Sequence, residues 1–76
     1  MRHGRDDYNR RIQDAEHRIP EDEPVFLIRG QDRVAGDAVR AWADLNEKAG
    51  GSAELSRQAR AWAERMDRWP QKKAAD

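Results

Sequence analysis

The chain contains no cysteine, so neither a disulfide framework nor a thiolate metal site can brace its fold. Its formal net charge is zero, with 15 Lys and Arg against 15 Asp and Glu, which removes any global attraction to nucleic acid or to an anionic membrane. No long apolar run is present. We therefore expect neither a signal peptide nor a membrane span, and a cytoplasmic location.

The chain is also short. A single domain of 76 residues buries only about 60% of its unfolded surface, which leaves a thin margin of stability. Burial of apolar side chains must supply that stability, and a core this small often recruits a second subunit.

Residues 1–19 form an arginine-rich N-terminal segment, and residues 20–76 form a core domain that begins with an acidic linker enclosed by two prolines. Within the first segment, apolar residues recur at steps of three and four, which predicts an optional helix from Asp6 to Ile19 that Pro20 would end. These residues are Tyr8, Ile12, Ala15 and Ile19.

Residues 25–28 are the one continuous apolar run, and their β-branched and aromatic content predicts a short strand. A lone strand has no partner for its backbone groups. Two solutions are open: packing across helices, or pairing with the same strand of a second copy. The second solution predicts a homo-oligomer.

Two stretches nearly repeat each other twenty positions apart, Val39–Asp44 and Ala59–Glu64. The apolar period around them is helical and predicts helices over about 36–49 and 53–69. Each helix carries one central tryptophan in its apolar row, and we expect the two rows to face each other and form the core.

The ends of these helices carry their own signals. Gly50 and Gly51 end the first helix, because glycine adopts the left-handed cap without strain, and Ser52 caps the second. The sequence therefore predicts a mainly α fold, a helical hairpin preceded by one short extended strand, with an additional N-terminal helix as an option.

Catalytic groups are scarce. Ser52 and Ser56 both fall at the start of a helix, where capping explains them, and a nucleophilic site would need a positioned base beside them. His3 and His17 lack metal-ligand spacing and are expected to be solvated surface imidazoles. We expect no enzyme activity, no metal and no cofactor.

Two aromatic residues and one turn are the preferred contact points for a partner. Phe26 and Trp69 are expected to remain partly exposed beside cations, as in many protein or base contacts. The turn that follows the strand pairs cations with a glycine and suits an anionic contact. The predicted partner-binding residues are Phe26, Arg29, Gln31, Arg33 and Trp69.

Nucleic-acid binding is the alternative. Arg57, Arg60 and Arg68 project from the face opposite the apolar row of the second helix. Glu64 lies among them and favours a salt-bridged ladder over an open phosphate-binding surface. The arginines of the N-terminal segment offer a second phosphate contact.

Three stretches carry a resemblance to a known family: Pro24–Asp32, Val39–Ala43 and Met66–Pro70. They resemble small uncharacterised proteins encoded in bacteriophages and prophages of GC-rich hosts. The resemblance implies a protein of the host cytoplasm that acts by binding. Its expected function is inhibition of a host antiviral component, with a host protein complex or a nucleotide signal as partner.

Overall fold

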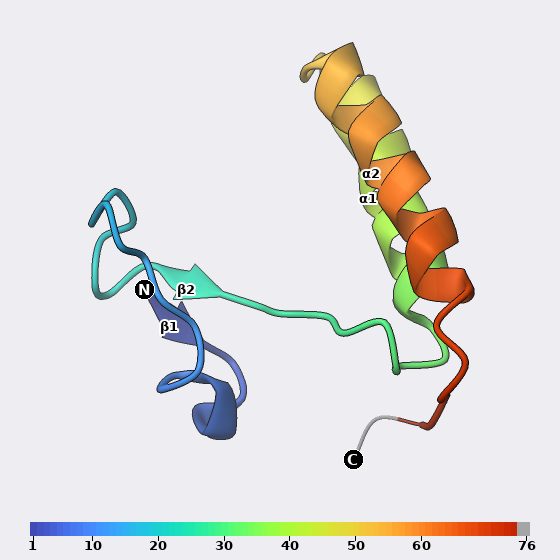
Figure 1. The fold of residues 1–76 in the computed structure, drawn as a ribbon. Coiled ribbons are helices and arrows are strands. Elements are labelled where there is room, and N and C mark those ends of the chain that lie inside the picture. The colour runs from blue at the N-terminus through green and yellow to red at the C-terminus, as the bar shows by residue number, and fades with distance from the viewer. Residues whose placement is uncertain (75–76) are drawn as a thin grey trace.

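The computed structural model describes residues 1–74 and is mainly helical. Helices α1 (Ala35–Lys48) and α2 (Ala53–Asp67) form an antiparallel hairpin, which confirms the predicted fold class. Ahead of them lie strand β1 (Arg2–His3), the 3-10 helix η1 (Asp6–Tyr8) and strand β2 (Pro24–Val25). Figure 1 shows this N-terminal part set apart from the hairpin, with an extended segment between them.

Local signals define the hairpin turn. Gly50 has φ of 79°, and its N–H donates to Glu47 O at 3.0 Å while the Gly51 N–H donates to Asn46 O at 2.8 Å. These two bonds satisfy the last carbonyls of α1 in the Schellman arrangement. Ser52 Oγ then accepts from the Leu55 N–H at 3.2 Å and caps α2 as predicted.

The expected lone strand has a partner within its own chain. β1 and β2 pair in parallel, with Arg2 opposite Pro24 and His3 opposite Val25. The strand predicted at 25–28 is therefore shorter, because its pairing ends where β1 ends. Neither packing across the helices nor a second copy is needed to satisfy its backbone.

Residues 6–19 form η1 and a series of turns in place of the optional helix. Tyr8 is buried against His3, so the chain turns back at this point rather than continuing as a helix. Asp14 then accepts from the Ile19 N–H at 2.7 Å, and His17 adopts φ of 54°. These local bonds compete with helix formation.

The contact between the two helices is made by small residues, and here the predicted core is wrong. Ala43, Ser56 and Ala63 have no exposed surface, whereas Trp42 is 45% exposed and Trp62 is 55% exposed. Small side chains let two helices approach closely, and an indole ring does not fit between them. The two tryptophans therefore lie outside the helix contact.

Polar bonds reinforce this close contact. Ser56 Oγ donates to Ala43 O at 3.2 Å and accepts from Asn46 Nδ2 at 2.8 Å. Asn46 Nδ2 also donates to Ser52 O at 3.1 Å. Buried Ser56 thus has a partner for its donor and its acceptor, as a buried hydroxyl requires.

The repeated sequence produces a repeated pattern of contacts. Arg40 of α1 reaches Asp67 of α2 at 2.9 Å, and Arg60 of α2 reaches back to Asp44 and Glu47 of α1 at 2.8 and 2.6 Å. Each repeat therefore sends one arginine to the opposite helix. The hairpin has an approximate internal two-fold symmetry that follows from the repeat.

The tail after α2 returns to the extended segment. Lys73 N donates to Gln31 O at 2.8 Å, and Arg33 N donates to Lys73 O at 3.1 Å. Lys72 Nζ donates to Gly30 O at 2.6 Å. These bonds attach the segment that carries the predicted partner-binding turn to the base of the hairpin.

Candidate functional site

His3 organises the N-terminal part, contrary to the expectation of a solvated imidazole. The ring is 3% exposed, and its Nδ1 accepts from the Arg5 N–H at 2.8 Å. The Tyr8 ring is nearly perpendicular to it, with an angle of 87° between the planes and ring centroids 5.1 Å apart. Phe26 is stacked on His3, with centroids 4.9 Å apart and planes inclined by 26°.

Phe26 is consequently held in place while it remains 68% exposed. Gly4 permits this position, because a Cβ there would lie 3.1 Å from Phe26 Cδ2, closer than carbon atoms normally pack. An exposed ring that is fixed from behind loses little conformational entropy on binding.

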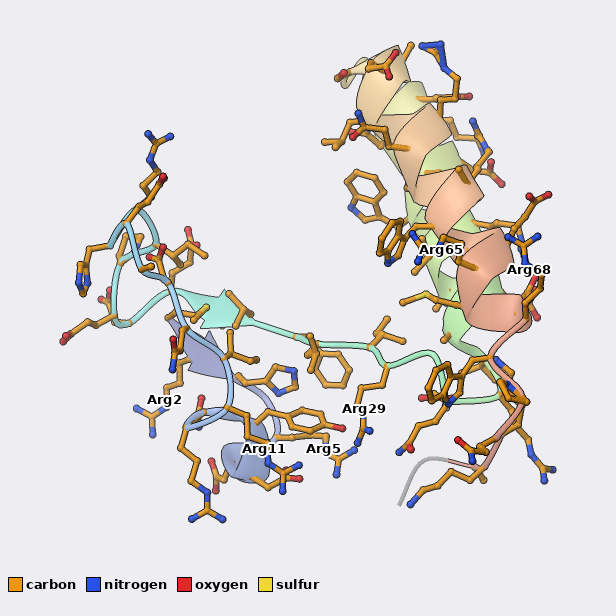
Figure 2. All side chains as sticks on the ribbon, viewed as in Figure 1. Arg2, Arg5, Arg11, Arg29, Arg65 and Arg68 are labelled. Atoms are coloured by element: carbon orange, nitrogen blue, oxygen red, sulfur yellow. The ribbon has the colours of Figure 1, made fainter. Side chains whose placement is uncertain are left out.

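Cations gather around Tyr8, which lines one cavity with Phe26. The Arg5 guanidinium lies 4.5 Å from the Tyr8 ring centroid and also pairs with Asp7 at 3.1 Å, while that of Arg11 lies 5.8 Å from the Tyr8 centroid. Figure 2 shows Arg5, Arg11 and Arg29 extending to the same side of the chain. We call Phe26 with these three arginines the cationic aromatic surface.

Two hollows bring the predicted partner-binding residues together. Phe26, Arg29 and Gln31 line a small cavity of about 90 Å³ beside Tyr8. Arg29, Gln31 and Trp69 also line a wider groove of about 420 Å³ along α2. Trp69 is 50% exposed.

Arg33 is exposed and lines neither hollow. The sequence did not lead us to assign Tyr8 to the site, and Arg11 was considered only among the N-terminal arginines that offer a phosphate contact. It also placed His3 on the surface, because nothing local indicates that Phe26 would stack on it.

Two of the arginines predicted to bind nucleic acid are engaged in ion pairs. Arg57 pairs with Glu54 within α2, and Arg60 is engaged by two carboxylates of α1. The hydrogen bond from Arg60 lowers the pKa of Glu47. At Arg60, ion pairs between the helices therefore replace the expected salt-bridged ladder through Glu64. Figure 2 shows Arg68, just after α2, extending on the side away from the N-terminal part.

Within residues 1–74 there is no group of three or more His, Asp or Glu side chains placed to hold a metal ion. No helix in that part of the chain is long and apolar enough to cross a membrane. A scan against protein-family models finds no match, and searches of curated proteins and of solved structures find no similar chain.

Proposed function

We propose that the chain is a non-enzymatic interaction protein that binds an acidic partner through the cationic aromatic surface. The observation that carries this proposal is Phe26, two-thirds exposed and yet fixed by its stacking on His3. Aromatic anchors of this kind contribute a large share of the energy in protein interfaces.

The charges beside Phe26 support an acidic partner. Arg11 and Arg29 form no ion pair within residues 1–74, so their charge is available to a partner. Arginine binds carboxylate in a two-pronged geometry and is enriched at protein interfaces. A partner with an apolar pocket rimmed by Asp or Glu would match this surface.

The resemblance to small phage proteins supplies a biological setting. In that setting the chain is a phage-encoded inhibitor in the host cytoplasm, and its target is a host antiviral protein complex. Binding alone would suffice for such inhibition, because occupying a functional surface of the target blocks it.

The test is capture from host lysate by the immobilised full chain, followed by affinity measurement with the captured protein. Phe26→Ala should weaken binding about 30-fold, as expected for an anchor residue, and Arg29→Glu should weaken it further at low salt. Val34→Ala is the matched control, since Val34 is an exposed apolar residue outside the surface. Equal affinity of Phe26→Ala and Val34→Ala would contradict the proposal.

A second candidate is a nucleotide or nucleic-acid ligand, because Arg5, Arg11 and Arg29 extend to one side next to an exposed ring. Phosphates would meet the arginines and a base would stack on Phe26. Titration with mononucleotides and a short oligonucleotide tests it, and binding must weaken steeply as salt is added. No binding at low salt would remove this candidate.

A further inference from the structure

The hairpin has two chemically different faces. Trp42 precedes buried Ala43 by one residue, and Trp62 precedes buried Ala63 in the same way. One residue is a rotation of about 100° around a helix axis. Because the helices are antiparallel and turn these alanines toward each other, the same rotation brings both tryptophans to one side of the hairpin.

Further large apolar residues continue that side. Leu55 lies seven residues before Trp62 on α2, and Trp69, just after α2, lines the same groove as Trp62. We call this side the tryptophan face, and it consists of the exposed residues Trp42, Leu55, Trp62 and Trp69, with Leu45 at its edge. Arg40 and Arg60 precede the same alanines by three residues and fall on the opposite side. There they form the ion pairs that connect the helices.

We infer that a second copy of this chain covers the tryptophan face, so that two hairpins form a four-helix bundle. This inference goes beyond the proposed partner binding, which uses the cationic aromatic surface. It also moves the expected self-association from residues 25–28 to the hairpin, since Val25 is already paired with His3.

The size of the face fits a dimer. Its three tryptophans are each about half exposed, which at roughly 250 Å² per residue amounts to nearly 400 Å². The two leucines bring the apolar area to about 500 Å² per chain. A standard interface buries about 800 Å² per partner and is about 65% apolar in homodimers, so it needs about the same apolar area.

The charge distribution also favours a second copy. The residues that define the tryptophan face include no carboxylate, and the ion pairs that connect the two helices lie on the other side. Arg65 lies beside the face with its guanidinium 4.3 Å from the Trp62 ring centroid, so its stem can cover apolar surface while its charge stays in water. Arg29 lines the groove beside Trp62 and Trp69 at the border of the face, so its guanidinium must also stay in water when two such faces meet.

The symmetry of the hairpin and its small core also favour a dimer. The internal two-fold of the hairpin, combined with the two-fold of a dimer, gives four equivalent helices, which is the arrangement of an antiparallel bundle. The buried residues of α1 and α2 are three alanines, a glycine and a serine, a small apolar core for two helices of this length. A second copy that covers the tryptophan face adds the apolar burial that the helix contact alone lacks.

The experiment is light scattering coupled to size exclusion, on the full chain. The wild type should elute at micromolar concentration with twice the 8.8 kDa chain mass. Trp62→Glu should weaken association at least a hundredfold and elute with the mass of one chain. Ala61→Glu is the matched control, because it places the same charge one residue away at an exposed position off the tryptophan face, and it should remain dimeric.

A wild type that keeps the mass of one chain throughout the micromolar range would overturn the inference, and so would dimeric Trp62→Glu. Circular dichroism shows whether that variant folds. If it does not, the wild type alone decides: a dimer requires a melting temperature that rises with protein concentration, and a melting temperature independent of concentration contradicts one.

Discussion

Replacing Ala63 with leucine tests the packing between the helices most sharply. Ala63 has no exposed surface and lies in the close contact between α1 and α2, so three added carbon atoms have no space there. Overpacking of this kind costs about 1–3 kcal/mol. For a domain of this size that loss lowers the melting temperature by roughly 5–20 °C.

The same substitution at Ala61 is the control. Ala61 is exposed on the same helix, and the helix propensities of alanine and leucine differ by only about 0.2 kcal/mol. Urea unfolding followed by circular dichroism measures both variants, at one protein concentration so that any self-association is held constant. Equal free energies of unfolding for Ala63→Leu and Ala61→Leu would refute the close contact of the helices.

Three other predictions concern the hairpin. Ser56→Ala should lower the free energy of unfolding by about 1–2 kcal/mol in urea titration, because its hydroxyl is buried and bonded on both sides; an unchanged midpoint would contradict that bonding. Ser52→Ala should cost about 1 kcal/mol through loss of the cap of α2, and no change in helix stability on thermal unfolding would count against the cap. Hydrogen bonds from arginines hold the pKa of Glu47 below its ordinary value of 4.5 and the pKa of Asp67 below its ordinary value of 3.8. The stability that these two ion pairs add is therefore present above the ordinary pKa values and is lost as pH falls through the lowered pKa values. Melting temperatures that do not fall on acidification below about pH 4.5 would contradict this.

The hairpin could be predicted because its signals are local. The helical period, the two glycines of the turn and the capping serine each act within a few residues. Glycine at position 50 is required by its positive φ, and Ser52 bonds to a residue three positions away. Such signals can be read without knowledge of the rest of the chain.

The side that each helix turns toward the other could not be predicted in the same way. An apolar row shows which side of a helix avoids water, but not which element covers it. Trp42 and Trp62 dominate the hydrophobic pattern and conceal a second row of small residues beside them. That row, which contains Ala43, Ser56 and Ala63, makes the helix contact.

Only part of the candidate site could be predicted, because the rest depends on contacts between distant residues. Phe26 and Arg29 follow directly from an apolar run and a turn, so they are visible in the sequence. Burial of His3 depends on contacts with Tyr8 and Phe26, and Phe26 is distant in the chain. The pairing of β1 with β2 creates that contact. Because the sequence did not reveal this pairing, it led us to expect His3 on the surface.

The most direct test of the outward tryptophans and of their coverage by a second copy is fluorescence quenching by acrylamide at several protein concentrations. On dilution to the single chain, we expect emission typical of solvated indole and strong quenching. At concentrations where the mass doubles, the emission should shift to the blue and quenching should weaken. Blue-shifted, protected emission from a sample with the mass of one chain would show that the rings lie inside the hairpin and would contradict both the outward tryptophans and their coverage by a second copy.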